Sequence, residues 1–163
     1  MRIIDLKQQP QHILAIAVWH FREWAHLNPG RNEAWLQEDM QCYLTDAFIP
    51  SMFIAVGDSG AVQGTSSIIA HDLAARPDLT PWLANVYVDA SQRGKGLGKR
   101  LVLHAMQQAK QAGMSTLYLF TPDQQAFYAR LGWQYLCTEY LHGHAETVMQ
   151  IRLADWPVPV TKV

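Results

Sequence analysis

Three glycines alternate with other residues in the segment Gln92-Arg93-Gly94-Lys95-Gly96-Leu97-Gly98, between a predicted strand and a predicted helix. Glycine lets the backbone turn sharply and approach a ligand closely. The first N–H groups of a helix have no partner within the helix and carry the positive end of its dipole, so they bind anions. Arg93 and Lys95 add positive charge. The segment therefore predicts a phosphate or pyrophosphate site, with a glycine-rich turn that binds nothing as the lesser alternative.

Two common phosphate motifs do not fit this segment. A P-loop, GxxxxGK[ST], aligned on Gly98-Lys99 would put Arg93 at its first glycine and Arg100 at the Ser or Thr that holds magnesium. A dinucleotide motif, GxGxxG, would end at Lys99 or Leu101, and neither is glycine. Both classes of nucleotide site are therefore disfavoured.

The pattern that fits is [RQ]-x-x-G-x-[GA], which is matched by Arg93, Gly96 and Gly98. An apolar strand at residues 82–89 precedes it, and Phe127-Tyr128-Ala129-Arg130-Leu131-Gly132-Trp133 follows it as F-Y-x-x-x-G-[FWY]. In these features the chain resembles the GNAT superfamily of acetyl-CoA-dependent N-acetyltransferases. The resemblance is strongest from about residue 82 to residue 133, and the order of elements extends it to nearly the whole chain.

The elements that must position this loop follow from hydrophobic periodicity and turn residues. The predicted strands are residues 2–6, 52–56, 61–70, 82–88, 116–120, 134–141 and 147–153. The predicted helices are residues 11–24, 32–44, 97–112 and 124–130. The order β-α-α-β-β-β-α-β-α-β-β mixes antiparallel hairpins with one β-α-β crossover, which predicts an α+β (mixed α/β layered) domain over residues 1–163. The resemblance implies the GNAT acyl-CoA N-acyltransferase fold, with a central, mostly antiparallel sheet and about four helices.

Composition excludes some function classes. The net charge is −1, whereas a protein that binds a nucleic-acid backbone is usually basic. No apolar run approaches the roughly 18 residues needed to span a membrane, and the N-terminus lacks the apolar core of a signal peptide. A cytoplasmic protein with no membrane partner is therefore expected.

The sequence offers little evidence for a metal or a disulfide. Cys42 and Cys137 lie far apart among apolar residues, which favours buried free thiols. The segment His142-Gly143-His144, with Glu146 beyond it, could bind zinc, but polar residues of a hairpin turn explain it better. We expect no metal.

The resemblance implies acetyl-CoA as the co-substrate. In that family the pantetheine arm pairs with the strand before the loop, and backbone N–H groups near Val88 would polarise the thioester carbonyl. The pyrophosphate would lie on the amides from Arg93 to Lys99. The implied cofactor-binding residues are Val86, Tyr87, Val88, Arg93, Gly94, Lys95, Gly96, Leu97, Gly98, Lys99 and Tyr128.

Acetyl transfer needs a neutral amine, a positioned thioester, a stabilised oxyanion and a proton for the departing thiolate. Tyr128 is the candidate acid, because a phenol with a pKa near 10 is matched to a thiolate; a purely structural aromatic is the alternative. Many family members carry a glutamate in the strand before the loop, where this chain has Asn85, which can orient a water but cannot take a proton. Other candidate bases are His71, Asp72, Glu139, His142 and His144, or a water relay to bulk solvent.

The acceptor amine is not specified by the sequence. In the resembled family its pocket is formed by the first two helices and the last hairpin, here Trp19, Phe21, Glu23, Trp24, His26, Trp35, Glu38, Asp39, Tyr140, His142 and His144. These residues suit an apolar amine or a peptide N-terminus. Two other classes remain: an acetyl-CoA-binding regulatory domain without turnover, and a nucleotide- or RNA-binding module. The apolar tail, residues 156–160, could cover a strand edge of its own chain or of a neighbour, so a monomer or a homodimer is expected.

Overall fold

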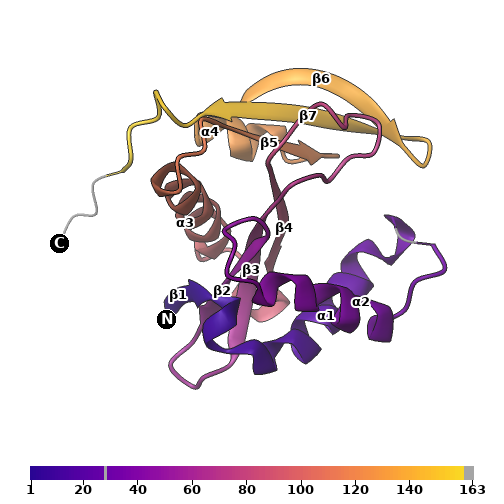
Figure 1. Ribbon diagram of the computed structural model, residues 1–163, viewed down its shortest axis with the longest axis vertical. Coiled ribbons are helices and arrows are strands. Elements are labelled where there is room, and N and C mark those ends of the chain that lie inside the picture. The colour runs from indigo at the N-terminus through magenta and orange to yellow at the C-terminus, as the bar shows by residue number, and fades with distance from the viewer. Residues whose placement is uncertain (28, 160–163) are drawn as a thin grey trace.

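The computed structural model describes residues 1–27 and 29–159, which form a seven-stranded sheet with helices on both faces (Figure 1). The strands are β1 (Arg2–Asp5), β2 (Ser51–Val56), β3 (Val62–Ile69), β4 (Trp82–Val88), β5 (Thr116–Thr121), β6 (Gln134–Leu141) and β7 (His144–Arg152). The α-helices are α1 (Ile13–Trp24), α2 (Glu33–Asp39), α3 (Leu97–Gln111) and α4 (Gln125–Arg130). The predicted element order and the mixed α+β fold class are confirmed.

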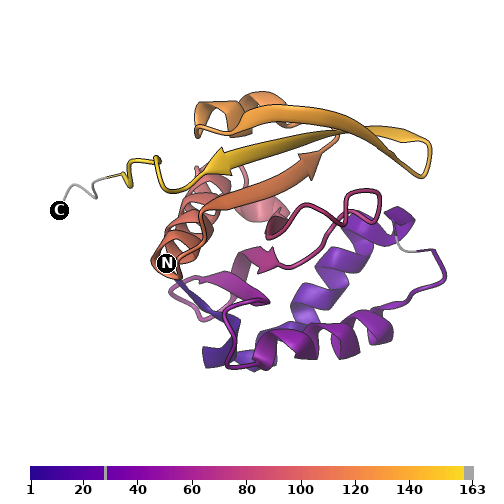
Figure 2. The ribbon, with the colours of Figure 1, turned by 45° about the horizontal axis from the view of Figure 1, so that its top comes forward.

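The sheet parts in its middle. Its strand order is β1-β2-β3-β4-β5-β7-β6, and neighbouring strands are antiparallel except for β4 and β5. The parallel strands β4 and β5 pair in register at Trp82 and Tyr118 and then separate, so β1–β4 and β5–β7 diverge (Figure 2). The backbone of β4 therefore has a free edge along most of its length.

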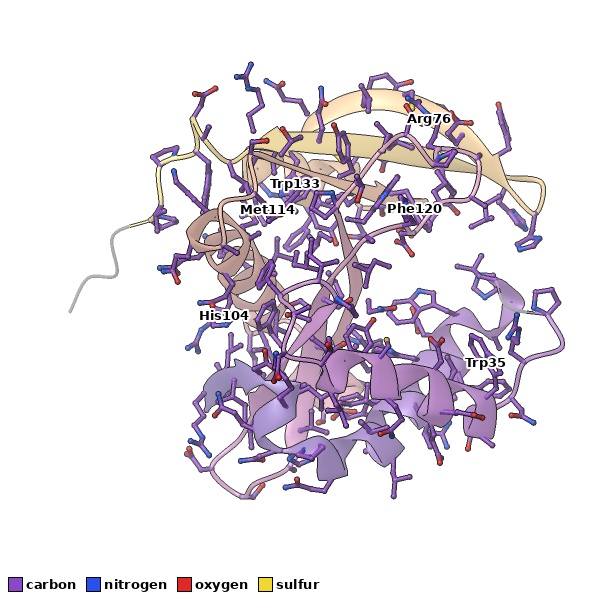
Figure 3. The ribbon with its side chains drawn as sticks, in the orientation of Figure 1. Trp35, Arg76, His104, Met114, Phe120 and Trp133 are labelled. Carbon is purple, nitrogen blue, oxygen red and sulfur yellow. The ribbon has the colours of Figure 1, made fainter. Side chains whose placement is uncertain are left out.

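Helices α3 and α4 cover one face of this sheet. Val102 of α3 is fully buried in a core that contains Leu83 of β4 and Leu119 of β5, so α3 spans the two halves where their strands part. Trp133, just after α4, belongs to the same core and lies beside α3 with Met114 (Figure 3). Burial of these side chains against both halves holds the divergent strands in a fixed relation.

Helices α1 and α2 pack on the opposite face of β1–β4. Ile16 of α1 is fully buried against Ile4 of β1 and Ile54 of β2. Further along this face, Leu73 in the β3–β4 loop packs on Trp82 and Val148, so that loop covers part of β7. We call this side of the sheet, away from α3 and α4, the acceptor face, because the first two helices were expected to help bind an acceptor amine.

Local sequence signals set several element ends. The Asn32 side chain accepts a hydrogen bond from the Trp35 N–H at 2.8 Å and begins α2, and Gly113 ends α3 with a φ of 87°. The second helix is shorter than predicted, because Met40–Leu44 is a 3-10 helix. The predicted break after α1 includes Asn28, which lies outside the described residues.

The two thiols are free, as predicted, but the expected burial of Cys42 is wrong. Cys42 is exposed because its neighbours Met40 and Tyr43 take the inward positions of the 3-10 helix. Cys137 is partly buried. In the predicted apolar tail, Trp156 packs into the chain's own core, and Val160 lies outside the described residues.

Candidate active site

The glycine loop leaves the start of α3 open and without a side-chain cap. Gly94 and Gly96 have φ values of 78° and 79°, a left-handed conformation that glycine adopts without strain. No side chain caps α3, and the first helical bond to the loop runs from the Arg100 N–H to the Gly96 carbonyl. Within the described chain, the N–H groups of residues 97–99 therefore have no partner, which is the arrangement that binds phosphate.

A cavity of about 250 Å³ lies over this loop. Its walls are Val88, Gln92, Arg93, Gly94, Gly96, Leu97, Gly98, Lys99 and Phe127. Lys95 and Arg100 are exposed beside it. The cavity thus runs from the end of β4 to the start of α3, with positive charge at its outer edge.

Arg93 ties the loop to the end of β4. Its Nε donates a hydrogen bond to the Val88 carbonyl at 3.0 Å, and its guanidinium carbon lies 5.5 Å from the centre of the Tyr87 ring. This cation has a structural partner, so the free positive charge at the loop comes chiefly from Lys95, Lys99 and Arg100.

Strand β4 contains a bulge. The β3–β4 register shifts by one residue between Thr65 and Ser67, and two β4 residues, Asn85 and Val86, oppose one residue of β3. Asn85 has a φ of 52°, in the left-handed region that asparagine tolerates better than most residues. The bulge reverses the face toward which each later β4 side chain points, just before Val88, which lines the cavity.

Hydrogen bonds hold this bulge from three sides. The Thr65 hydroxyl donates to the Asn85 carbonyl at 2.7 Å. The Asn85 side-chain amide donates to Ser67 Oγ at 2.9 Å and to Tyr43 Oη at 3.1 Å. Asn85 therefore has a structural role, which the sequence did not reveal. Because its amide nitrogen is engaged, only its Oδ1 could orient a water.

After the bulge, pairing with β3 determines which backbone groups of β4 face β3 and which face the free edge. The Asp89 N–H donates to the Gln63 carbonyl at 2.8 Å, so residues 87 and 89 direct their backbone groups toward β3. Because these groups alternate along a strand, those of Val86 and Val88 point to the free edge where β5 has parted. The Arg93 contact to the Val88 carbonyl lies on this same side.

Side chains of β4 alternate in the same way. Val86 and Val88 pack on the α3 side, whereas Tyr87 faces α1. The Tyr87 ring centre lies 5.2 Å from that of Trp19 and 6.2 Å from that of Trp24. The sequence-predicted acceptor residues Trp19 and Trp24 are therefore brought together at the bulge.

His20 is buried in this aromatic group and is 5% exposed. Its Nε2 lies 3.0 Å from Thr65 Oγ1, and because the Thr65 proton is given to Asn85, His20 is the donor. Burial lowers the pKa of His20 to about 3. His20 therefore remains neutral near pH 7 and links α1 to the bulge.

Tyr128 lies in α4, next to the cavity wall formed by Phe127. It is 8% exposed and packs against the rings of Phe127 and Trp133, with centres 5.0 and 6.2 Å away. Burial raises the pKa of Tyr128 to about 12, so its phenol is fully protonated at neutral pH.

The other predicted acceptor residues are dispersed. His142 Nε2 lies 3.3 Å from the Leu27 carbonyl, so the β6–β7 turn contacts the chain after α1. Trp35 lies against the Arg31 guanidinium, 4.0 Å from the ring centre, away from the bulge (Figure 3). Exposed side chains are those of Glu23, His26, Glu38, Asp39, Tyr140 and His144.

The candidate bases differ in their surroundings. His71 is exposed, and Glu139 pairs with Arg76 at 3.6 Å beside β6. Asp72 is partly buried next to Leu73, and burial raises the pKa of Asp72 to about 7. Burial raises the pKa of Tyr43, whose hydroxyl contacts the bulge, and the charge of Asp72 adds to that rise, so Asp72 is coupled electrostatically to the bulge.

Residues 1–27 and 29–159 contain no cluster of three or more His, Cys, Asp or Glu side chains that could bind a metal. In the same residues, no helix combines the length and the apolar character that a membrane span requires.

Solved structures of three acetyltransferases are similar to this chain, all at a level of identity that shows the fold alone. Aminoglycoside 6′-acetyltransferase type Ii is 18% identical with a TM-score of 0.73, and the alignment covers 96% of this chain and 100% of that one. A Salmonella typhimurium acetyltransferase solved with acetyl-CoA is 20% identical, with a TM-score of 0.65 and 99% coverage of both chains. A Brucella melitensis ribosomal-protein-alanine N-acetyltransferase is 16% identical, with a TM-score of 0.68 and coverage of 93% and 99%.

Sequence comparison gives the family. A glucosamine 6-phosphate N-acetyltransferase from Oryza sativa subsp. japonica is 44% identical over 50 residues, a local match that spans only 30% of each chain. The family model described as acetyltransferase (GNAT) family matches residues 15–133. Since that match covers most of the chain and the fold agrees with it, this protein belongs to the GNAT acetyltransferase family.

Proposed function

We propose that this protein transfers the acetyl group of acetyl-CoA to a primary amine of a small molecule or of a peptide N-terminus. The amine would attack directly in a ternary complex. The observation that carries the proposal is the open cavity that joins the unpartnered amides of residues 97–99 to the free edge of β4. When bound, acetyl-CoA supplies a thioester whose carbonyl carbon is open to attack by an amine nitrogen.

The glycine loop fits a pyrophosphate. Its backbone amides point outward and side chains are absent at Gly94 and Gly96, where a Cβ would meet no other atom but would strain a left-handed backbone. Gly94, Gly96 and Gly98 therefore form the cradle, and Lys95 and Lys99 supply charge. Arg93 holds the loop against β4 through the Val88 carbonyl.

Strand β4 fits the pantetheine arm. The backbone groups of Val86 and Val88 face the edge that β5 leaves open, so they can pair with an extended amide chain as a strand would. The Val88 N–H would also donate to the oxyanion that forms as the amine attacks. Tyr87 supports this edge from the acceptor face and limits access of water.

Two side chains would move the protons. Tyr128, protonated and next to the cavity wall, would protonate the departing thiolate. Asp72 would take the proton of the attacking amine, directly or through a water oriented by Asn85, because it lies in the loop that leads into β4, is coupled electrostatically to Tyr43 at the bulge, and titrates near neutral pH. A carboxylate in the β3–β4 loop would thus replace the one that β4 lacks.

The alternative is an acetyl-CoA-binding regulatory domain without turnover. The observation in its favour is that the amide nitrogen of Asn85 is already engaged by Ser67 and Tyr43. A panel of primary amines with acetyl-CoA separates the two. We expect free thiol to be released with at least one of alkyl amines, amino sugars including glucosamine 6-phosphate, and peptides with a free N-terminus. Binding of acetyl-CoA without thiol release from any of them would leave only the regulatory domain.

Gly96→Ala should weaken binding of coenzyme A several-fold, because a Cβ strains the left-handed residue that opens α3. Gly60→Ala is a matched control, since Gly60 has a φ of 85°, also has open space around it and lies in the distant β2–β3 turn. Both changes should cost about 1 kcal/mol of stability. Calorimetric titration with coenzyme A should separate them, and equal affinities would remove the loop from the binding site.

Tyr128→Phe should lower kcat about 100-fold or more, the usual contribution of a general acid, with little change in the KM for acetyl-CoA. Tyr135→Phe, at a 62% exposed position on β6, should leave both constants unchanged. Steady-state thiol release on the best amine of the panel measures this. A kcat that survives in the Tyr128 variant would leave the tyrosine a structural role only.

Asp72→Asn should lower kcat/KM and remove an inflection near pH 7, since only the ionised carboxylate accepts a proton. The folded-state pKa of Asp72 lies above its unfolded value, so ionisation destabilises the fold as pH rises toward 7. The variant should therefore gain more in Tm over the native protein at pH 8 than at pH 5. Asp78→Asn, where Arg76 lowers the pKa, is the control and should keep the inflection. An unchanged pH profile in the Asp72 variant would exclude this base.

A further inference from the structure

Glu146 of β7 is a buried carboxylate with one oxygen that is unpaired among the described residues. The residue is 4% exposed, and its Oε2 has no hydrogen-bond partner among the described residues. Buried polar atoms are normally paired, and one left unpaired costs free energy. Burial accordingly raises the pKa of Glu146. Such a group is readily explained if a ligand supplies the missing partner.

The carboxylate faces the acceptor side of the sheet. Alternate residues of a strand share a face, so Glu146 lies on the same side as Val148, which packs on Trp82 and Leu73. Phe120, opposite Val148 in the β5–β7 pair, projects from this side, away from α3 (Figure 3). Glu146 therefore shares a face with the aromatic group at Tyr87.

Strand register places Glu146 level with the β4 bulge. Trp82 is opposite Tyr118, so three residues further along both strands Asn85 is level with Thr121, which pairs with Thr147 of β7. Glu146 is next to Thr147 but two strands away from β4. At roughly 5 Å per strand the separation is at least about 10 Å, and the parting of β4 from β5 widens it.

Charged side chains surround the approach to this carboxylate. His144 on β7 and His26 after α1 oppose the rise in the pKa of Glu146, and Asp123 after β5 adds to it. All three are exposed, so they line the solvent side while Glu146 lies within. The contact of His142 with Leu27 closes the outer end of this region. Asp123 and Glu146 therefore place two carboxyl groups in this region.

We propose that Glu146 binds a protonated ammonium group of the acceptor, one that is not the amine being acetylated. The distance from β4 is too long for Glu146 to act on the reacting nitrogen, but it suits a second amine of the same molecule. The acceptors would then be diamines or polyamines with at least about 10 Å between the two nitrogens. This inference rests on the proposed function and names the substrate class for the same site.

Acetylation of matched amines tests this. The diamines 1,8-diaminooctane and 1,10-diaminodecane are compared with octylamine and decylamine, which lack only the second ammonium. We expect the native protein to prefer the better diamine to its monoamine by at least about tenfold in kcat/KM, the effect of a charged hydrogen bond. Glu146→Gln should abolish that preference by lowering the diamine value alone.

Glu139→Gln is the matched control, since Glu139 lies directly across from Glu146 on β6 but is already paired with Arg76. It should keep the diamine preference. Thermal unfolding of Glu146→Gln should show little loss of Tm, because Oε2 of the native carboxylate has no hydrogen bond within the described residues to lose. A variant with unchanged diamine preference would overturn the proposal.

A binding measurement separates failure of this inference from failure of the proposed function. Titration of 1,8-diaminooctane into the protein with coenzyme A should give weaker binding in Glu146→Gln than in the native protein. If no amine is acetylated but this difference is found, the transferase function fails and the ammonium site stands. If amines are acetylated with equal preference in both proteins, the function stands and the ammonium site is excluded.

Discussion

The hydrogen bonds around Asn85 are the constraint on which the rest of the site depends. A left-handed asparagine costs about 1 kcal/mol, and three hydrogen bonds from Thr65 and to Ser67 and Tyr43, each contributing about 1 kcal/mol, offset it. A shift of one residue moves every later side chain of a strand to the other face. Without the bulge, Tyr87 would point toward α3 and the Val88 amide toward β3. The bulge therefore determines which backbone groups lie on the free edge of β4 and which side chains face the acceptor side.

His20 connects α1 to the bulge through a buried hydrogen bond that carries no net charge near neutral pH. Its proton is directed at Thr65, whose own proton is directed at Asn85, so the tautomer and the chain of donors are fixed together. The low pKa of His20 means that protonation would oppose folding, which keeps α1 fixed to β3 and β4 near neutral pH. A helix of the acceptor face and the strand of the donor side are thus joined through one buried polar contact.

The sequence predicted the fold well, and it allowed the donor side to be proposed, because the signals for both are local. The glycine loop, the preceding strand and α3 are contiguous in the chain, and each element has a clear period or cap. The bulge network could not be predicted, since Tyr43, Ser67 and Asn85 come from separate segments and only folding unites them. The exposure of Cys42 was missed because an apolar neighbourhood in sequence does not say which residue of a 3-10 turn points inward. Glu146 was noticed only as part of a metal hypothesis, because residues 144–147 contain no large apolar side chain that would reveal the alternation of β7.

The donor side and the acceptor side of the proposed site differ in how readily they can accept substitutions. On the donor side, β4 is fixed by β3, by the bulge and by Arg93, and α3 is buried against both halves of the sheet. On the acceptor side, the β6–β7 turn meets the chain after α1 through His142 and Leu27, a single exposed contact. Substitutions in that turn or in the β3–β4 loop can therefore change the charge and shape of the acceptor region without disturbing the bulge. This separation gives a physical reason why the loop motif supports a proposal for the donor, whereas the acceptor has to be inferred from buried groups such as Glu146.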